Sequence, residues 1–344
     1  MKILITGGCG FVGSNLSIFL KSKGFKIYSL DNLSRKGSTL NQKRLSKLNI
    51  KNFKIDIFNS KHIDKLDKFD LIIDCCAEPS VEASRKSLIE ARRVFNTNLV
   101  GTFNILQKCV KDKSKIIFLS SSRVYSIKKI NSLFKKKINK LNQKINNQID
   151  VSFDKSSPKT LYGLTKLFSE DLIKEFSYSN GIKYLINRCG VIAGPWQMGK
   201  VDQGFVSLFI WRYLKKAPLT FIGYKGKGYQ IRDILHCNDL NELIFMQIKQ
   251  FNKIYNKTFT VGGSKNNTIS LYGLSELLKK KTKNNVPIKK KLQTSIYDIP
   301  YFVTSNKEVS KTYNWKPKNN ISNIINDVYD WQIKNYNNLR KIFR

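Results

Sequence analysis

A tyrosine and a lysine four residues apart carry the clearest chemical signal in this sequence. Tyr162 and Lys166 stand at the start of a predicted helix, so that both side chains share one face. A free tyrosine is a poor base at neutral pH, and a nearby ammonium group stabilises the phenolate that accepts a proton. Without further context, the same pair is an ordinary solvated face of a helix.

Three glycines near the N-terminus follow the first predicted strand and open the first predicted helix. Gly7 permits a tight turn, Gly10 lets the backbone approach a pyrophosphate, and Gly13 lets the helix pack closely on the strand. Phe11 and Val12 lie between them at the helix N-terminus, where a pyrophosphate binds. The pattern predicts a dinucleotide-binding turn.

An acidic residue stands about 20 residues further on, where such a site needs it. Asp31 ends the second predicted strand and is expected to bind the adenosine ribose hydroxyls beside Asn32. Its carboxylate would repel a 2′-phosphate and favours NAD, although nearby Arg35 leaves NADP open. Asp56, followed by Ile57, is expected at the adenine amino group; a loop-capping role for this aspartate is equally consistent.

The glycine spacing GxxGxxG and the YxxxK pair together resemble the extended short-chain dehydrogenase/reductases of the NAD-dependent epimerase/dehydratase family. Residues 118–125 are similar to the family segment SS[ST]xxVYG. Aligning on Val124 and Tyr125 implies that Ser121 carries the catalytic hydroxyl, with its two serine neighbours as alternatives. The closing glycine of the segment is replaced by Ser126, which leaves the shape of this loop open.

Two further segments extend the resemblance along the chain. Residues 76–79 (CAEP) follow the fourth predicted strand, where the family has a turn over the nicotinamide ribose, which implies contacts from Ala77 and, on the substrate side, Glu78. Asn98 matches the family motif NxxGT and is expected near the cofactor. The resemblance also implies that Tyr162 and Lys166 contact the nicotinamide ribose.

The two residues after the catalytic serine separate the reactions of the family. The 4,6-dehydratases carry an Asp-Glu pair there and the UDP-glucuronate decarboxylases a glutamate, whereas this chain has Ser122 and Arg123. We expect both residues on the substrate side. Without an acid for elimination or decarboxylation, reversible hydride transfer remains, as in an epimerase or a simple reductase.

Residues 187–204 and 230–236 resemble the substrate segments of the CDP-paratose (CDP-tyvelose) 2-epimerases, which contain an R…GxxQ…DQG arrangement and a QxRDxxH motif. The resemblance implies five substrate-binding residues: Arg188, Gln197, Gln203, Gly204 and Arg232. Trp196 offers a ring for base stacking. Arg232 is expected to grip the diphosphate, with an ion pair to Asp233 as the alternative.

One departure concerns the second diphosphate-binding arginine of the family motif RxxD. The corresponding run here is Ser295 to Asp298, without an arginine. Binding of the nucleotide then depends on Arg232, Lys200 or another cation, and the identity of the base stays open.

The elements that must position these residues alternate between strand and helix. Strands are predicted at 2–6, 26–30, 53–55, 71–73, 116–119 and 184–187, and helices at 11–20, 89–111 and 161–177. This order predicts an α/β fold with a doubly wound parallel sheet, the Rossmann fold, over residues 1–187. A smaller α/β substrate-binding lobe follows at 188–344, with some chain crossing back.

Composition excludes several other classes. No apolar run approaches the roughly 20 residues of a membrane span, and the N-terminus runs directly into a strand, so that a cytoplasmic protein is expected. Six cysteines without a CxxC pair and only two histidines argue against disulfides and against a metal site.

The net charge of +38 invites a nucleic-acid partner, but the lysines are spread over the whole chain. A nucleic-acid role therefore ranks last. A basic insertion at about 126–150 is the exception, and its Lys- and Asn-rich part, 128–147, is expected to be a solvated, weakly packed loop.

These observations together predict an NAD-dependent nucleotide-sugar epimerase. The resemblance implies inversion at C2 of a CDP-3,6-dideoxyhexose, and it implies a homodimer formed through long helices. A UDP- or dTDP-hexose 4-epimerase and a 4-ketoreductase are the rival enzymes. A non-catalytic NAD sensor is more remote, because this chain keeps Ser121, Tyr162 and Lys166.

Overall fold

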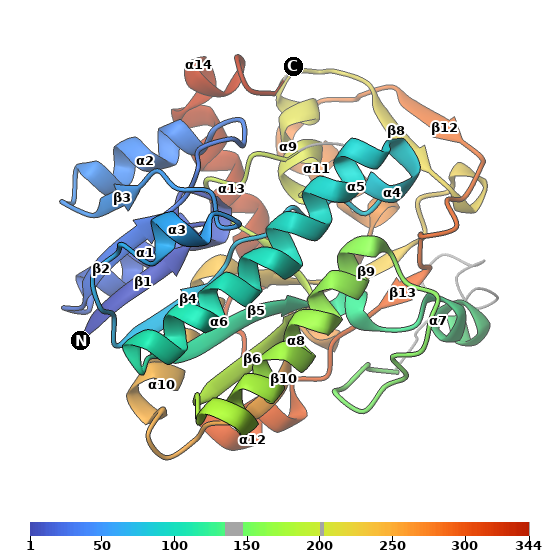
Figure 1. Cartoon of the computed structure of the whole chain (residues 1–344). Helices are drawn as coiled ribbons and strands as arrows, with labels where there is room; N and C mark the ends of the chain where they lie inside the picture. Colours follow the sequence, from blue (N-terminus) through green and yellow to red (C-terminus); the bar gives the residue numbers. More distant parts are fainter. Residues whose placement is uncertain (135–146, 200–202, 344) are drawn as a thin grey trace. The chain divides into compact units, whose positions relative to one another are not determined.

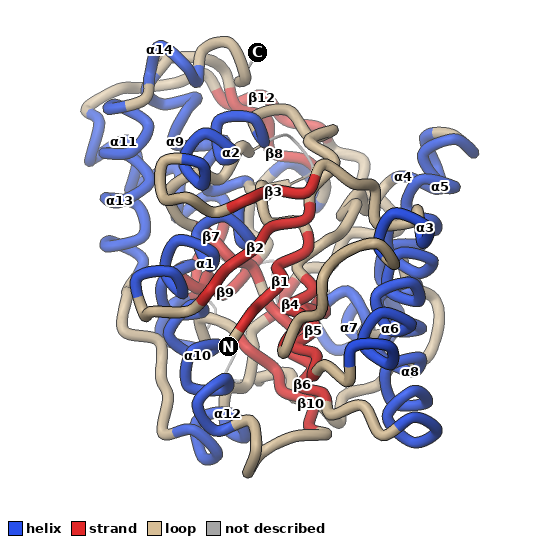
Figure 2. Tube along the Cα trace, turned by 60° about the vertical axis from the view of Figure 1, so that its left-hand side comes forward, coloured by secondary structure: helices blue, strands red, loops and turns tan. Residues whose placement is uncertain are grey.

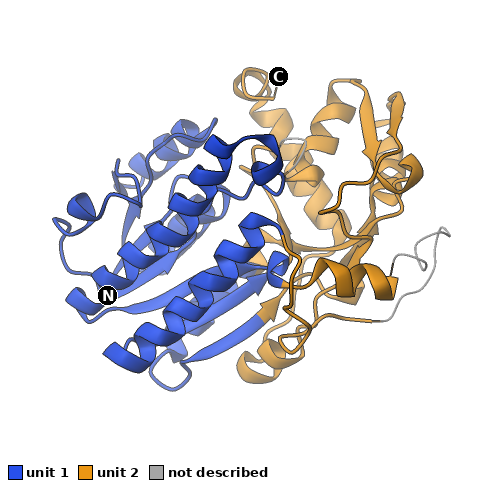
Figure 3. Ribbon diagram, turned by 45° about the vertical axis from the view of Figure 1, so that its right-hand side comes forward, with its two compact units in different colours: residues 1–124, 160–189, 240–259 blue, residues 125–159, 190–239, 260–344 orange. Residues whose placement is uncertain are grey.

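The computed structural model describes residues 1–134, 147–199 and 203–343. It divides into two compact units, shown in Figure 3. The first comprises residues 1–124, 160–189 and 240–259, and the second comprises residues 125–159, 190–239 and 260–344. The described residues of the basic insertion therefore belong to the second unit. Most of the helix Cys237–Gln250, which follows the QxRDxxH segment, belongs to the first.

A seven-stranded sheet forms the centre of the first unit, in the order β10-β6-β5-β4-β1-β2-β3. The five pairings from β6 to β3 are all parallel, which confirms the predicted doubly wound α/β fold. The strands are β1 (Lys2–Thr6), β2 (Lys26–Leu30), β3 (Lys51–Phe53), β4 (Leu71–Asp74), β5 (Lys115–Ser121), β6 (Tyr184–Cys189) and β10 (Lys257–Val261). The third strand thus lies two residues earlier than predicted, since its register is set by pairing with β2.

Helices cover both faces of this sheet, as Figures 1 and 2 show, with α6 and α8 on one side and α1 and α10 on the other. The helices and helical turns of the first unit are α1 (Phe11–Ser22), α2 (Ser38–Ser46), α3 (Ser60–Ile63), α4 (Ala83–Lys86), α5 (Leu88–Phe95), the π-helical turn η1 (Asn96–Val100), α6 (Gly101–Asp112), the 3₁₀ turn η2 (Ser122–Val124), α8 (Leu161–Asn180) and α10 (Cys237–Gln250). The predicted helix at 89–111 is therefore interrupted by one π-helical turn at Asn98. Such turns are frequent at functional sites.

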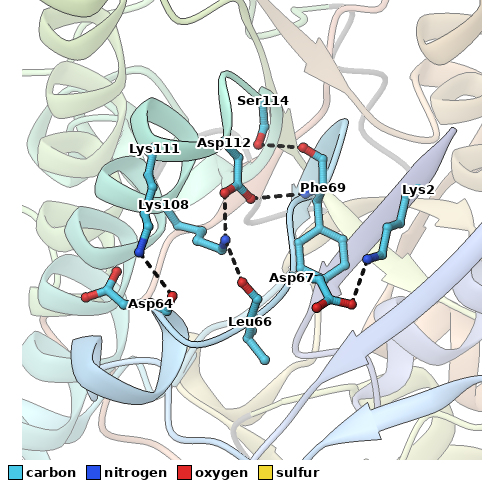
Figure 4. Close-up of polar contacts among 9 residues, drawn as sticks. All are labelled: Lys2, Asp64, Leu66, Asp67, Phe69, Lys108, Lys111, Asp112 and Ser114. Carbon is cyan, nitrogen blue, oxygen red and sulfur yellow. Dashed lines mark hydrogen bonds and ion pairs between the residues drawn. The ribbon is translucent and has the colours of Figure 1, made fainter.

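A buried ion pair anchors α6 at the edge of the sheet where β4 and β5 begin (Figure 4). Lys108 is 1% exposed and donates to Asp112 at 2.6 Å and to the carbonyl of Leu66 at 3.0 Å. Asp112 accepts from the amide of Phe69, whose carbonyl in turn accepts from Ser114. Every polar group in this cluster is paired with another, so the segment before β4 is held on α6. The opposite edge, where the strands end, carries the site.

The second unit contains a smaller sheet in the order β11-β9-β13, with β7 also paired to β9, and a parallel pair of β8 and β12. Its strands are β7 (Val191–Ala193), β8 (Leu219–Ile222), β9 (Ile231–His236), β11 (Thr268–Ser270), β12 (Ile288–Lys291) and β13 (Tyr301–Phe302). Its helices are α7 (Ile127–Phe134), α9 (Phe205–Leu214), η4 (Tyr224–Gly226), η5 (Lys265–Asn267), α11 (Leu271–Thr282), α12 (Lys307–Tyr313), α13 (Ile321–Lys334) and α14 (Tyr336–Leu339). A core that includes Ile210, Trp211 and Val328 joins α9 to α13.

The start of the basic insertion packs, contrary to the expected solvated loop. Residues 127–134 form α7, whose apolar residues Ile127, Ile130 and Phe134 fall on one helical stripe and are at most 6% exposed. The ring of Phe134 lies 4.5 Å from that of Tyr301. The expectation was wrong for this part because the three apolar residues were outweighed by the surrounding lysines. Residues 135–146 of the insertion lie outside the described residues.

Within the described part of the chain, no helix has both the length and the apolar character needed to cross a bilayer.

Candidate active site

The glycine turn is packed so tightly that side chains would not fit. Gly7 has a left-handed backbone (φ +61°), and a Cβ there would lie 2.9 Å from the Cα of Cys76. A Cβ on Gly13 would lie 2.3 Å from the carbonyl oxygen of Gly7, and one on Gly10 would lie 3.0 Å from the same oxygen. The helix α1 begins at Phe11 without a side-chain cap. Its first amides are thus available to a pyrophosphate, which is the arrangement a dinucleotide requires.

Asp31 is tied to this turn by its own hydrogen bonds. Its carboxylate accepts from the amide of Cys9 at 3.0 Å and from that of Leu33 at 2.8 Å. Burial raises the pKa of Asp31, while these backbone bonds and the charge of Arg35 oppose the rise. Asn41 of α2 also donates to the carbonyl of Cys9, a support that no sequence motif indicated.

The predicted adenine-side residues lie beyond the end of β3. Asn32 donates to the Asp56 carboxylate at 2.7 Å, so that one oxygen of Asp56 already has a partner. Ile57 is buried, and a Cβ on Gly101 would lie 2.6 Å from its side chain. The glycine of the NxxGT motif is therefore needed for packing α6 against this loop. The adenine contact of Asp56 stays a prediction.

A buried aspartate at the end of β4 was missed by the sequence analysis. Asp74 is fully buried and accepts from the hydroxyl of Thr6 at 2.5 Å, the amide of Cys76 at 3.1 Å and the hydroxyl of Thr102 at 3.3 Å. It joins the ends of β1 and β4 to α6. The threonine of the NxxGT motif was the available signal, because a hydroxyl on a buried helix face needs a polar partner.

Asn98 connects the segment after β4 to α8. Its side chain accepts from the amide of Glu78 at 2.8 Å, donates to the carbonyl of Glu78 at 3.2 Å, and donates to the hydroxyl of Thr165 at 3.2 Å. The turn that contains Ala77 is therefore held next to the helix that carries Tyr162. The carboxylate of Glu78 forms an ion pair with Arg93 at 2.9 Å.

The helix α8 presents the tyrosine and the lysine as predicted. Thr160 caps its N-terminus by accepting from the amide of Gly163 at 2.9 Å. Lys166 is 1% exposed, donates to the carbonyl of Cys76 at 3.3 Å and lies 4.3 Å from the ring centroid of Phe118. Tyr162 is half-buried. The two residues lie one helical turn apart on α8, and the catalytic role of the pair stays a prediction.

Ser121 is the last residue of β5 and lies next to the start of α8. Its hydroxyl accepts from the amide of Arg123 at 3.2 Å. A Cβ on Gly163 would lie 2.1 Å from the carbonyl oxygen of Arg123, so the turn after Ser121 is pressed against the residue after Tyr162. The structure thereby brings the three predicted catalytic residues to one edge of the sheet, with half-buried Ser122 and Arg123 beside them.

Arg188 requires a correction. It was expected to bind substrate, but it is 3% exposed and pairs with fully buried Glu170 at 2.6 Å. Its side chain lies at the end of β6, beneath the site. A guanidinium so deeply buried with a carboxylate partner is unavailable to a ligand, and we reassign it to the scaffold.

The predicted substrate residues of the second unit lie in the loop between β7 and α9. Gln197 donates to the carbonyl of Ile192 at 3.0 Å. A Cβ on Gly204, which has φ +68°, would lie 3.0 Å from the Gln197 amide carbon. Trp196 also has a positive φ of +70° and packs on Trp331, with ring centroids 5.7 Å apart. Gln203, in the same loop, is half-buried, and Lys200 lies outside the described residues.

Arg232 pairs with Asp298 rather than with its neighbour Asp233. The guanidinium lies 3.4 Å from Asp298 and also donates to the carbonyls of Ile231 and Ile299. The aspartate of the incomplete RxxD motif therefore keeps a role in orienting Arg232. Its side chain is 12% exposed, so binding of a diphosphate by this cation stays a prediction.

Comparison with known proteins agrees with this geometry. Residues 3–262 match the model of the "NAD dependent epimerase/dehydratase family". The chain belongs to this family. It is 30% identical to the CDP-paratose 2-epimerase of Salmonella typhi, over 96% of this chain and 99% of that protein. It is 28% identical to a putative UDP-glucose 4-epimerase of Methanocaldococcus jannaschii, over 97% and 99% of the two chains.

A solved structure with the same fold is the UDP-glucuronic acid 4-epimerase of Bacillus cereus, in complex with UDP-glucuronic acid and NAD. The TM-score is 0.80 at 22% identity, over 97% of this chain and 99% of that one. As a member of the NAD dependent epimerase/dehydratase family, the protein is an enzyme whose cofactor is NAD. The glycine turn, the open first turn of α1 and the position of Asp31 fit that cofactor.

Proposed function

We propose that this enzyme is a nucleotide-sugar epimerase that inverts a ring carbon by oxidation and re-reduction, of the CDP-paratose 2-epimerase type. The observation that carries the proposal is the turn after the catalytic serine. Ser122 and Arg123 occupy it, and neither is an acid that eliminates water. The similarity to the CDP-paratose 2-epimerase of Salmonella typhi over nearly the whole chain supports the choice of substrate.

In this mechanism, Tyr162 accepts the proton of a ring hydroxyl, while Ser121 donates a hydrogen bond to the same oxygen. The buried ammonium of Lys166 stabilises the tyrosinate electrostatically. NAD held by the glycine turn and Asp31 would supply the hydride acceptor for the oxidation and, once reduced, the hydride donor for the re-reduction. After the keto-sugar has turned over, Tyr162 gives the proton back to the oxygen.

The predicted substrate contacts divide by chemistry. We assign the diphosphate to Arg232, because a guanidinium binds phosphate oxygens in pairs. We assign the base and ribose to Gln197, Gln203 and Gly204, which belong to one loop between β7 and α9 and offer two side-chain amides. The sugar is assigned to the loop of Ser122 and Arg123 and to Glu78.

A panel of CDP-, UDP-, GDP- and dTDP-sugars, with separation of epimers, tests the proposal. CDP-sugars inverted at C2 are expected as products, without consumption of added NAD. A UDP-hexose inverted at C4 would instead favour the alternative that the relative from Methanocaldococcus jannaschii suggests. A 4-keto-6-deoxy product would overturn the assignment of Ser122 and Arg123.

Solvent labelling tests the mechanism in the same assay. If the hydride leaves and returns to one carbon without meeting solvent, the product formed in deuterated water carries no carbon-bound deuterium at the inverted centre. Deuterium there would indicate deprotonation of carbon and overturn the roles given to Ser121, Tyr162 and Lys166.

We further propose a homodimer formed through α5, α6 and α8. These helices expose large apolar side chains: Phe95 is 44%, Phe103 39% and Phe168 47% exposed. Phe168→Glu is expected to give a monomer by light scattering, because a buried unpaired carboxylate opposes association. Phe58 is 46% exposed in the loop between β3 and α3, outside the three helices, so Phe58→Glu should leave the dimer intact. A monomeric wild-type protein would contradict the proposal.

We also propose a cytoplasmic location. All six cysteines are free thiols, and four of them are buried. Reduced thiols of this kind are typical of the cytoplasm.

A further inference from the structure

A buried polar cluster joins three elements directly beneath the proposed catalytic residues. Glu170, one turn after Lys166 on α8, is fully buried and accepts from Ser120 on β5 at 2.5 Å. The same carboxylate accepts from Arg188 on β6 through Nε at 3.0 and 3.1 Å and through Nη2 at 2.6 Å. The bond from Ser120 links the helix of Tyr162 to the residue that precedes Ser121.

A second contact joins the same helix to the turn η2, which follows β5. Gly163 packs on the carbonyl of Arg123, as described above. The two contacts lie seven positions apart on α8, about 10.5 Å along the helix axis. On the other segment they lie three positions apart, from Ser120 in β5 to Arg123 in η2. Two points of attachment oppose sliding of α8 along β5.

We propose that Glu170 is a positioning residue that, through Ser120 and Arg188, sets the place of α8 along β5 and so the distance of Ser121 from Tyr162 and Lys166. The inference rests on the proposed catalytic roles of those three residues. A buried ion pair seldom adds net stability over apolar side chains of the same volume, so we assign this cluster a role in geometry rather than in stability.

Ser120→Ala tests the inference, because it removes one hydrogen bond and leaves the ion pair intact. Its matched control is Ser114→Ala, which removes a 3.0 Å bond to Phe69 from a serine of similar burial at the far edge of the sheet. We expect kcat of Ser120→Ala to fall about tenfold, since small misplacements of reacting groups have effects of this size or larger. KM and NAD content should stay within about twofold of the wild-type values, and the control should keep its kcat.

The split between kcat and KM separates positioning from a general loss of stability. Tyr162 and Lys166 move together on α8, so a shift of this helix changes their distance from Ser121 on β5 and not from each other. In Ser120→Ala kcat should therefore fall at unchanged KM, whereas Ser114→Ala, with a comparable loss of stability, should keep both. A second variant, Glu170→Met with Arg188→Met, replaces the pair with apolar groups of similar length; it should fold and show the same fall in kcat.

Hydrogen exchange of residues 161–170 gives a readout independent of turnover. Faster exchange there in Ser120→Ala, together with the fall in kcat, supports the inference. Unchanged kcat in Ser120→Ala would overturn it, whether or not exchange increases. If wild-type protein turns over no nucleotide-sugar, the proposed function fails. In that case, unchanged hydrogen exchange of α8 in Ser120→Ala would also overturn the proposal that Glu170 holds α8 on β5.

Discussion

The carbonyl oxygen of Arg123 occupies the space that a side chain on Gly163 would need. A Cβ at residue 163 would lie 2.1 Å from that oxygen, well inside contact distance. The residue after the proposed base and the turn after the proposed catalytic serine therefore meet backbone to backbone. This contact explains why the residue between Tyr162 and Leu164 is a glycine, even though it lies in a helix.

Gly163→Ala is expected to destabilise the enzyme, although the higher helix propensity of alanine alone would predict stabilisation. Alanine is favoured over glycine in a helix by about 1 kcal/mol, but the clash should cost at least about 2 kcal/mol and displace Tyr162. Denaturant unfolding and kcat measure both effects. Gly273→Ala is the matched control: it stands at the same position after a serine cap on α11, and a Cβ there would be no closer than 3.3 Å to any neighbour. Equal stability of the two variants would contradict the argument.

Tyr162→Phe is expected to lower kcat by about two to four orders of magnitude while NAD stays bound, because the hydroxyl acts in proton transfer. Released nucleotide, measured after denaturation, should equal that of the wild type. Tyr272→Phe provides the control, since Tyr272 follows the same Leu-Tyr-Gly-Leu pattern on α11 without a lysine four residues later. Near-normal turnover of Tyr162→Phe would rule out the assigned base.

Asp31→Asn is expected to weaken the preference for NAD over NADP by at least about tenfold, a difference of about 1.4 kcal/mol. The substitution removes the charge that repels a 2′-phosphate and keeps a similar shape. Binding of both cofactors to stripped protein measures the ratio. Asp67→Asn, at a largely exposed position beside Lys2, should leave it unchanged. NADP as the main nucleotide released from wild-type protein would overturn the prediction.

Asp233 makes the stability of the second unit depend on pH. Burial raises its pKa to about 6, although hydrogen bonds from Thr304 and Ser264 oppose the rise. The folded state therefore binds the proton more tightly than the unfolded chain, whose aspartate has a pKa of about 3.9. The stabilising contribution is complete below about pH 4 and is lost as the pH rises through about 6, a change of about 3 kcal/mol.

Asp233→Asn should remove this dependence, because an amide does not titrate in this range. The difference in unfolding free energy between wild type and variant, measured from pH 4 to pH 7, is expected to shift by about 3 kcal/mol in favour of the variant. A difference that stays constant with pH would show that the pKa of Asp233 is the same in the folded and unfolded states.

Phe134→Ala is expected to lower the free energy of unfolding by about 3 to 5 kcal/mol, because Phe134 is 2% exposed and stacks close to Tyr301. Leu133→Ala, one residue earlier and 40% exposed, should change stability by no more than about 0.5 kcal/mol. Thermal unfolding of the two variants compares them directly. A similar melting temperature for both would mean that α7 contributes nothing to the core.

The sequence by itself was enough for the fold class and for the identity of the proposed catalytic residues. Glycines three residues apart, a tyrosine and lysine one helical turn apart, and alternating apolar runs are local patterns, and local spacing determines which side chains share a turn or a helix face. The predicted strands at 2–6 and 26–30 have the observed bounds for the same reason.

Only the tertiary structure decided the partners of the buried polar residues. Nothing near Arg188 in the sequence shows that it faces Glu170 rather than a substrate, because helix and strand meet only after the sheet has formed. The same holds for Arg232, which pairs with Asp298 instead of the adjacent Asp233, and for α7, whose apolar stripe finds Tyr301 far along the chain. The sequence shows that a charged or aromatic side chain can form an interaction, but not with which partner. The partner depends on packing between segments that are distant in the sequence, and burial determines whether a ligand can reach the side chain.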